Sequence, residues 1–281
     1  MKGGPLAERI LAEVADDVRE LGEVGLATVQ VGEDPASAIY IRRKHEAAHE
    51  AGMRSVDRKL PAETSQEELV AAVAELNEDD GVDGILVQLP LPDGLDEALA
   101  VAAIDPVKDV DGVHPFNAGQ LYLGRPTHVP ATPLGIMALL AEHKVSLDGA
   151  RAVVVGRSDI VGKPVAHLLL QANATVTICH SHTDDLERHA LDADVLVVAA
   201  GVPEVVTADM VKSGSAVVDV GINRVEGGLV GDVDPDAAER AAFLTPVPGG
   251  VGPMTIAMLL RNTVRAAGYR RGLLAFPGAP R

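Results

Sequence analysis

The sequence predicts an α/β fold of two lobes, the second of which is a Rossmann-type doubly wound parallel sheet. Short apolar runs alternate with amphipathic segments along the chain, as expected for parallel strands separated by covering helices. The length of 281 residues is enough for two ordinary domains. The alternation is clearest from Arg151 onward, where four apolar runs predict strands at 152–155, 175–178, 195–199 and 216–220.

The first half of the chain has the same βα rhythm. Apolar positions between residues 5 and 21 have the spacing of one helical face. The following elements are expected to be a strand at 26–31, a helix at 36–51 ended by Gly52, a helix near 65–78 and a strand at 84–89. A last helix at about 254–267 follows a loop rich in glycine and proline, and we expect it to return to the first lobe.

The charge and composition exclude several classes of partner. The chain has 24 basic and 41 acidic residues, so its net charge of −17 repels nucleic acids and anionic membranes. No apolar run approaches the roughly 20 residues that span a bilayer. The single Cys179 excludes an internal disulfide, and the start of the chain lacks the basic and apolar regions of a signal peptide. We therefore expect a cytoplasmic protein.

A dinucleotide site is predicted where the run at 152–155 ends. Gly156 follows this strand, and the helical pattern of residues 165–172 comes shortly after. A glycine turn leading into a helix offers N–H groups and a positive dipole end to phosphate. Ser158 stands where the fingerprint usually has its second glycine, which weakens the motif.

The end of the next strand favours NADP over NAD. An NAD site usually carries an acidic residue here to bind the ribose 2′-hydroxyl, but this chain has Cys179-His180-Ser181-His182. Arg157 and Ser181 are candidates to meet a 2′-phosphate instead, with His182 as a possible helper if protonated.

Tyr40 and Lys44 lie four positions apart in the predicted helix at 36–51, so they project from one face. An aromatic ring can stack on a planar heterocycle, and a buried lysine can exchange protons near neutral pH. Three further clusters lie in loops after strands, where open α/β sheets bind ligands: Gln88-Leu89-Pro90-Leu91-Pro92, residues 108–115 with Asp109 and Asp111, and the glycine-proline segment 245–255.

Together with Gly156-Arg157-Ser158, these segments resemble the bifunctional methylenetetrahydrofolate dehydrogenase/cyclohydrolase family, in the family's order and over nearly the whole chain. The resemblance implies NADP-dependent oxidation of 5,10-methylenetetrahydrofolate and hydrolysis of the methenyl product to 10-formyltetrahydrofolate, in support of purine, methionine and histidine biosynthesis. It also implies a homodimer, a folate-binding catalytic domain at 1–128 completed by 250–281, and an NADP-binding domain at 129–249. Three departures stand out: Ala131 replaces a common Cys, Val113 a common Phe, and His182 the usual basic residue.

The resemblance also assigns roles to single residues. Lys44 is implied as the proton-transfer residue of the hydrolytic step, Gln88 as the residue that positions and tunes it, and Asp111 as the group that holds the pterin. Tyr40 is implied to stack on the substrate. Gly249, Gly250 and Pro253 are implied to line the folate cleft, whereas the implied cofactor contacts are Gly156, Arg157, Ser158, Ser181 and Ile222.

Three other functions compete with this interpretation. His45-Glu46-Ala47-Ala48-His49 matches the H-E-x-x-H zinc motif on a helix, but no third ligand is defined and we expect no metal. An NADP-dependent dehydrogenase of another small substrate would explain residues 150–222 only. A nucleotide-sensing protein without activity would leave the polar candidates near Lys44 without a purpose.

Overall fold

Two compact units make up the chain in the computed structural model, which describes residues 1–32 and 35–277 and, within these, all side chains except those of 35–40. Met1–Glu8 and Pro130–Ala257 form one unit, called here the five-stranded unit after its main sheet. Arg9–Val129 and Met258–Arg281 form the other, the three-stranded unit. Within the described residues, no helix combines the length and apolar character needed to cross a membrane.

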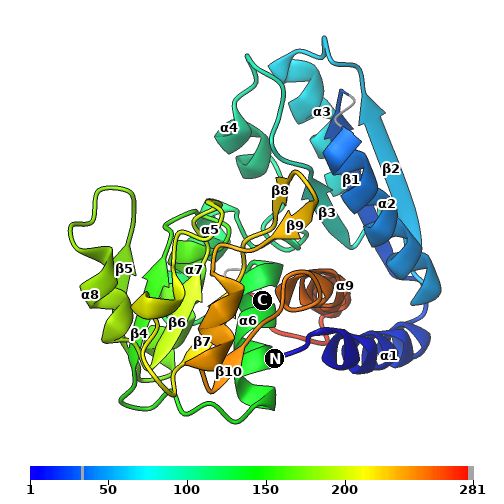
Figure 1. Cartoon of the computed structure of the whole chain (residues 1–281). Coiled ribbons are helices and arrows are strands. Elements are labelled where there is room, and N and C mark those ends of the chain that lie inside the picture. The colour runs from blue at the N-terminus through cyan, green and yellow to red at the C-terminus, as the bar shows by residue number, and fades with distance from the viewer. Residues whose placement is uncertain (33–34, 278–281) are drawn as a thin grey trace. The chain divides into compact units, whose positions relative to one another are not determined.

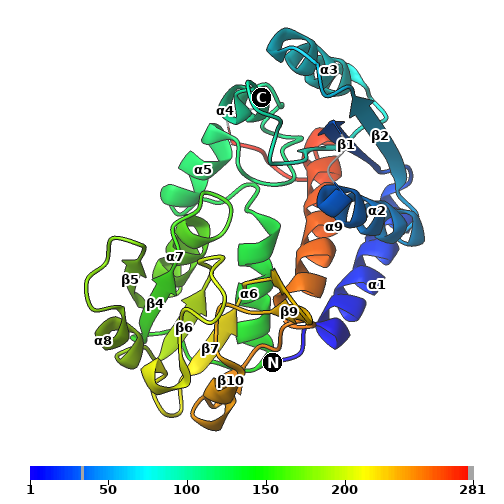
Figure 2. The same ribbon diagram turned by 45° about the horizontal axis from the view of Figure 1, so that its top comes forward.

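The three-stranded unit contains a parallel sheet in the order β2-β1-β3, in which Val29 of β1 lies opposite Val87 of β3. Figures 1 and 2 show the helices around it. The strands are β1 (Gly25–Val31), β2 (Arg54–Leu60) and β3 (Gly84–Val87), and the helices are α2 (Pro35–Glu50), α3 (Gln66–Glu78), α4 (Glu97–Ala102), α5 (Pro115–Tyr122) and most of α1 (Gly4–Leu21) and α9 (Val251–Arg270).

Successive side chains of β1 point to opposite faces of this sheet. Ala27, Val29 and Val31 pack with the buried residues of α3 in an apolar core. Ser65 begins α3 with a capping box in which its hydroxyl accepts from the backbone N–H of Glu68. The opposite face of β1 carries Thr28 and Gln30, both buried, so a polar strip runs along the face opposite the α3 core.

The five-stranded unit has a parallel sheet in the order β10-β7-β6-β4-β5. Its strands are β4 (Arg151–Val155), β5 (Thr175–Cys179), β6 (Val195–Val198), β7 (Ala216–Asp219) and β10 (Phe243–Leu244), with a separate antiparallel hairpin of β8 (Asn223–Val225) and β9 (Gly228–Val230). Its helices are α6 (Ala131–Glu142), α7 (Gly162–Gln171), α8 (Leu186–Leu191), η1 (Ala208–Met210) and η2 (Pro235–Glu239).

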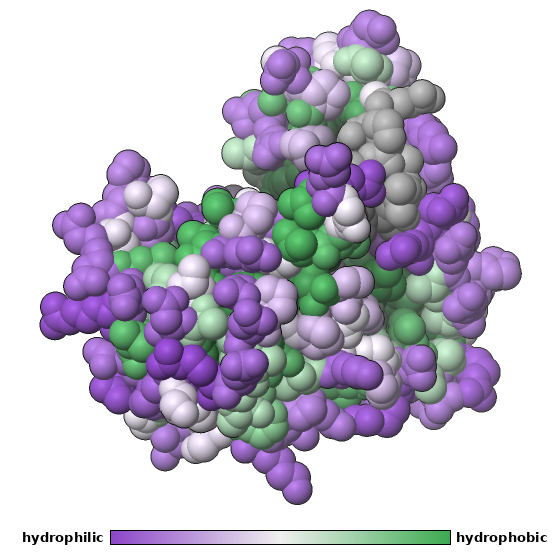
Figure 3. Space-filling model, viewed as in Figure 1, coloured by the Kyte–Doolittle hydropathy of each residue, from purple (hydrophilic) through white to green (hydrophobic). Residues whose placement is uncertain are grey.

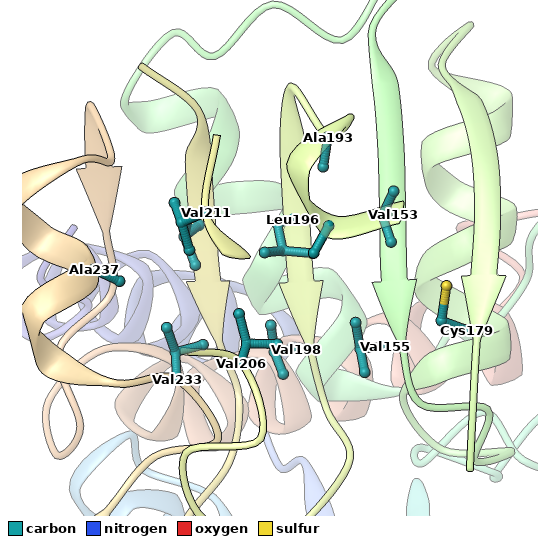
Figure 4. Close-up of a cluster of buried hydrophobic side chains, with 12 residues drawn as sticks. Val153, Val155, Cys179, Ala193, Leu196, Val198, Val206, Val211, Val233 and Ala237 are labelled. Atoms are coloured by element: carbon teal, nitrogen blue, oxygen red, sulfur yellow. The ribbon is translucent and has the colours of Figure 1, made fainter. Parts of the chain in front are cut away.

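Both faces of this sheet are covered, as a doubly wound sheet requires. Val153, Leu196 and Val217 point into a core shared with Ala190 of α8 and Ala237 of η2, and Figure 4 shows part of this cluster. The residues between them along the strands point to the opposite face, where α7 packs on β4 and β5 and α6 packs against α7. The predicted fold class is therefore confirmed. The surface seen in Figure 3 is largely hydrophilic, in keeping with the high net charge.

The predicted elements are found with small shifts of their ends. The helices predicted at 5–21, 36–51 and 65–78 correspond to α1, α2 and α3. The strand predicted at 84–89 stops at Val87, and the last helix is longer than predicted at both ends. Part of it belongs to the three-stranded unit, where the Asn262 amide donates to the carbonyls of Val110 and Val129 at 2.8 and 2.9 Å.

Candidate active site and dinucleotide turn

Lys44 and Gln88 meet directly in the three-stranded unit. Lys44 lies in the second half of α2, and Gln88 is the first residue after β3. The Lys44 Nζ donates to the Gln88 Oε1 at 3.2 Å, while the Gln88 Nε2 donates to the carbonyl of Leu89 at 2.7 Å. The second bond fixes the side-chain amide with its oxygen toward the lysine, so Gln88 accepts a hydrogen bond from Lys44.

Burial and charge then set the protonation of this amine. Burial lowers the pKa of Lys44, and the Asp111 carboxylate partly opposes this by favouring the ammonium. Burial raises the pKa of Asp111 to about 6. The nearby Lys44 charge lowers this pKa and the nearby Asp109 carboxylate raises it, but burial has the largest effect. Lys44 therefore gives up its proton more readily than an exposed lysine, which suits a group that transfers protons.

A buried framework holds Asp111 beside this pair. The Asp109 carboxylate accepts from the His114 backbone N–H at 2.8 Å and from the Asn117 Nδ2 at 2.8 Å. The Thr127 hydroxyl in turn donates to the Asn117 Oδ1 at 2.5 Å. Burial raises the pKa of Asp109, and these hydrogen bonds oppose the rise. Asp109 thus orders the loop that carries Asp111.

Lys108 fixes the other end of this loop. Its Nζ donates to the backbone carbonyls of Leu76, Asn77 and Asp79 at 3.1, 2.7 and 2.9 Å. The side chain is almost fully buried and supplies a positive charge at the C-terminal end of α3. Sequence reasoning grouped Lys108 and Asp109 with Asp111 as one loop motif, and it could not show that the first two serve the framework.

Tyr40 lies in α2, one turn before Lys44, but its side chain lies outside the described residues. The competing zinc motif lies in the same helix. The His45 Nδ1 is hydrogen-bonded to the Ser55 hydroxyl at 2.5 Å, and the His49 side chain is exposed. Among the described side chains, no three His, Cys, Asp or Glu residues are grouped in a way that could hold a metal ion.

The glycine turn after β4 lies in the five-stranded unit. Gly156 has a φ of 122°, and a Cβ added to it would lie 2.1 Å from the carbonyl oxygen of Ala199. The Ser158 hydroxyl accepts from the backbone N–H groups of Val161 and Gly162 at 3.2 and 3.3 Å. Ser158, which replaces the second glycine of the fingerprint, therefore stabilises the start of α7. The Arg157 and Ser158 side chains are both exposed.

Ser181 and His182 follow the neighbouring strand at the same edge of the sheet. Val155 at the end of β4 lies opposite Cys179 at the end of β5, and the Gly156 N–H donates to the Cys179 carbonyl at 2.8 Å. The parallel register therefore brings the Arg157 and Ser181 turns next to each other, and both Ser181 and His182 are exposed.

The remaining predicted contacts of this unit lie beyond β7 and β10. Ile222 follows β7 and is 44% exposed, and its Cδ1 lies 3.7 Å from where a Cβ on Gly252 would be. Gly249 has a φ of 102°, and its carbonyl accepts from the Gly3 N–H at 2.9 Å. Gly250 is buried, whereas Pro253 is partly exposed in the first turn of α9. The structure thus gathers Lys44, Gln88 and Asp111 in one unit and all predicted cofactor contacts in the other.

Comparisons with known proteins agree with this division. Residues 1–111 match the catalytic domain of tetrahydrofolate dehydrogenase/cyclohydrolase, and residues 130–271 match its NAD(P)-binding domain. A curated relative, the bifunctional protein FolD of Halothermothrix orenii, is 54% identical over 274 residues, which are 95% of this chain and 97% of the relative.

Two solved structures are similar over almost their whole length. The bifunctional FolD methylenetetrahydrofolate dehydrogenase/cyclohydrolase of Campylobacter jejuni has a TM-score of 0.94 and 47% identity, covering 96% of this chain and 98% of its own. The Trypanosoma brucei enzyme, solved with NADP cofactor and inhibitor, has a TM-score of 0.92 and 41% identity, covering 98% of each chain. With both halves matched in order and the relatives covered almost completely, this chain belongs to the tetrahydrofolate dehydrogenase/cyclohydrolase family.

Proposed function

We propose that Lys44, Gln88 and Asp111 form the active site in which this enzyme handles both of its folate substrates. The protein is a bifunctional NADP-dependent methylenetetrahydrofolate dehydrogenase and methenyltetrahydrofolate cyclohydrolase of one-carbon metabolism. The observation that carries the site assignment is the hydrogen bond between Lys44 and Gln88 beside Asp111, in a setting that lowers the pKa of the amine.

The hydrolytic step uses the three residues in different ways. Water adds to the methenyl carbon, a cation stabilised by its two flanking nitrogens, and the unprotonated Lys44 takes a proton from that water. The resulting ammonium then gives a proton to the nitrogen that leaves as the C–N bond breaks, and the new hydroxyl releases its remaining proton to solvent as the formyl C=O bond forms. Gln88 holds the amine through its Oε1, and the Asp111 carboxyl binds the donor groups of the pterin.

The oxidative step needs positioning more than it needs an acid. NADP, when bound, supplies the hydride acceptor. Tyr40 stacks on the folate, and Gly249, Gly250 and Pro253 line its cleft. By this proposal residues 1–128, completed by 250–281, bind folate, and residues 129–249 bind NADP.

The residues at the turns after β4 and β5 suit NADP in their chemistry. Gly156 allows the tight turn, Ser158 orders the start of α7, and the exposed Arg157 offers a cation next to the Ser181 turn. The segment after β5 carries no acidic residue before Asp184, so nothing there opposes a 2′-phosphate. Ile222, exposed beyond β7, is the apolar contact of this site.

We further propose a cytoplasmic homodimer that supplies one-carbon units for purine, methionine and histidine biosynthesis. The net charge of −17 argues against nucleic acid as a partner. Analytical ultracentrifugation tests the dimer, since a monomer at all concentrations would contradict it.

Absorbance of the methenyl product tests the function. Purified protein is mixed with methylenetetrahydrofolate and either NADP or NAD, and in a second assay with methenyltetrahydrofolate alone. We expect methenyl formation with NADP in the first assay and accelerated decay of methenyl absorbance in the second. If folded protein binds NADP but acts in neither assay, a dehydrogenase of another small substrate becomes the better explanation.

A further inference from the structure

Two buried carboxylates lie where the five-stranded sheet meets its functional loops. Asp219 is the last residue of β7, and Asp232 lies just beyond the β8–β9 hairpin. Their side chains are only 4% and 0% exposed. Buried carboxylates are costly unless hydrogen-bonded, so their partners indicate what they are for.

Asp232 ties the loop after β6 to the segment after β7. Its Oδ2 accepts from the consecutive backbone N–H groups of Ala200 and Gly201 at 2.7 and 2.8 Å. Its Oδ1 accepts from the Asn223 side-chain amide at 2.8 Å. A carboxylate accepts at both oxygens without donating, so it can serve all three donors at once.

Asp219 continues the same network toward two further segments. Its Oδ1 accepts from the N–H groups of Gly221 and Asp232 at 3.0 and 2.9 Å, and its Oδ2 accepts from that of Val233 at 3.1 Å. The Thr245 hydroxyl accepts from the Asp219 N–H at 2.7 Å and donates to the Asp219 carbonyl at 3.1 Å. The loop after β10 is thereby joined to the end of β7.

The loop held by Asp232 packs against the dinucleotide turn at Gly156. The Ala199 N–H donates to the Val155 carbonyl at 2.7 Å, and the Ala199 oxygen closes the space beside Gly156. Glycines are also required around the carboxylates themselves, because a Cβ on Gly221 or Gly231 would lie 2.1 or 1.7 Å from a carboxylate oxygen of Asp232 or Asp219. Asp232 therefore holds the two residues that directly follow Ala199, whose carbonyl oxygen lies beside Gly156.

We infer that Asp219 and Asp232 are positioning residues that hold the loops after β6 and β7 in the conformation that NADP binding requires. They act through backbone N–H groups rather than by touching the cofactor, and the inference rests on the proposed function. In the sheet order, β6 and β7 lie on one side of β4, while β5 with Ser181 lies on the other. The two carboxylates thus support the part of the cofactor site that NADP and NAD share, and not the part that reads the 2′-phosphate.

Asp232→Asn is the principal test. Asparagine keeps the shape but replaces one acceptor oxygen with a donor, which cannot satisfy both the Asn223 amide and the two loop N–H groups. We expect the Kd for NADP and for NAD to rise by similar factors, about tenfold. Hydrolysis of methenyltetrahydrofolate, which consumes no cofactor, should stay within about twofold of the wild-type rate.

A milder variant and a control accompany it. Asn223→Ala removes one donor from the network, so we expect it to raise both Kd values by less than Asp232→Asn does. This variant provides the test if Asp232→Asn fails to fold. Asp234→Asn changes a neighbouring aspartate that only caps η2 through the Asp236 N–H at 2.9 Å, and it should leave both Kd values unchanged.

The outcomes separate the inference from the function on which it rests. If Asp232→Asn and Asn223→Ala are folded and bind both cofactors as the wild type does, or if hydrolysis falls in parallel with cofactor affinity, the positioning role is wrong. A rise in the Kd for NADP without a rise in the Kd for NAD would also contradict the positioning role. If the wild-type protein itself lacks NADP-dependent activity, the proposed function fails instead.

Discussion

Replacing Lys44 with methionine removes the amine to which we assign proton transfer, while keeping an unbranched side chain of similar length. A positioned acid or base contributes about 10²–10⁴-fold to a rate, which corresponds to about 3–5 kcal/mol of activation free energy. Lys44→Met should lower the hydrolytic rate by this factor. The dehydrogenase reaction should remain measurable, because hydride transfer needs no proton from Lys44.

The same structure predicts little loss of stability in this variant. Gln88 loses one hydrogen bond at 3.2 Å, which costs about 1 kcal/mol. The variant also no longer buries an amine, and this gain offsets part of that cost. Circular dichroism during urea unfolding should therefore give a free energy of unfolding close to that of the wild type.

The assay compares both activities in wild type, Lys44→Met and a control. Lys59→Met is a suitable control, because Lys59 is 72% exposed on β2 and pairs only at the surface with Asp57 at 3.4 Å. Normal hydrolysis by folded Lys44→Met would refute the assigned role. Equal loss of both activities would show that Lys44 serves substrate binding rather than proton transfer.

Three other substitutions test separate parts of the account. Lys108→Met leaves three backbone carbonyls near the end of α3 without their donor and should cost about 2–4 kcal/mol in urea unfolding; an unchanged midpoint would contradict the framework role. Arg157→Ala should raise the Kd for NADP in titration calorimetry much more than that for NAD, whereas an equal rise in both Kd values would contradict the proposed contact between Arg157 and the 2′-phosphate. Gly156→Ala places a Cβ against the Ala199 carbonyl and should weaken the binding of both NADP and NAD without slowing hydrolysis; normal dehydrogenase kinetics would contradict this.

The sheets could be predicted from the sequence because their strands are buried. The runs that became β4, β6 and β7 are mostly apolar on both faces, as parallel strands covered by helices must be. β1 is buried along its whole length, although Thr28 and Gln30 are polar. β2 was not predicted, since Arg54–Leu60 carries four charged residues and lies at the sheet edge with most side chains at least partly exposed. Its strand conformation comes from pairing with β1 rather than from its own pattern.

The candidate site could be predicted only where the chemistry showed in the local sequence. Tyr40 and Lys44 were selected because they are four positions apart in a predicted helix. Gln88 directly follows β3, and Asp111 follows Asp109, which forms an isolated bridge with Ile85 of β3, so their positions in loops after strands pointed to them. Asp219 and Asp232 gave no such signal, because their role depends on backbone N–H groups from segments far apart in the chain. The glycines flanking them, Gly221 and Gly231, were the only local sign of a close approach.

The pH dependence of hydrolysis follows from the environment of Lys44. In the proposed mechanism the unprotonated amine is the active form, so the rate should increase as pH rises through the lowered pKa of this lysine. Asp111→Asn removes the carboxylate that favours the ammonium, so it should lower the pKa of Lys44 further. A pH–rate profile of the hydrolysis that is unchanged in Asp111→Asn would contradict this electrostatic link.

Titration of Lys44 itself tests the central claim most directly. NMR spectroscopy of protein with isotope-labelled lysine follows each amine with pH, and the signal missing from Lys44→Met identifies Lys44. We predict a pKa below the ordinary value of 10.5, because burial beside Gln88 disfavours the ammonium. A pKa at or above 10.5 would show that Lys44 remains charged at neutral pH and would contradict its role as the proton acceptor of the hydrolysis.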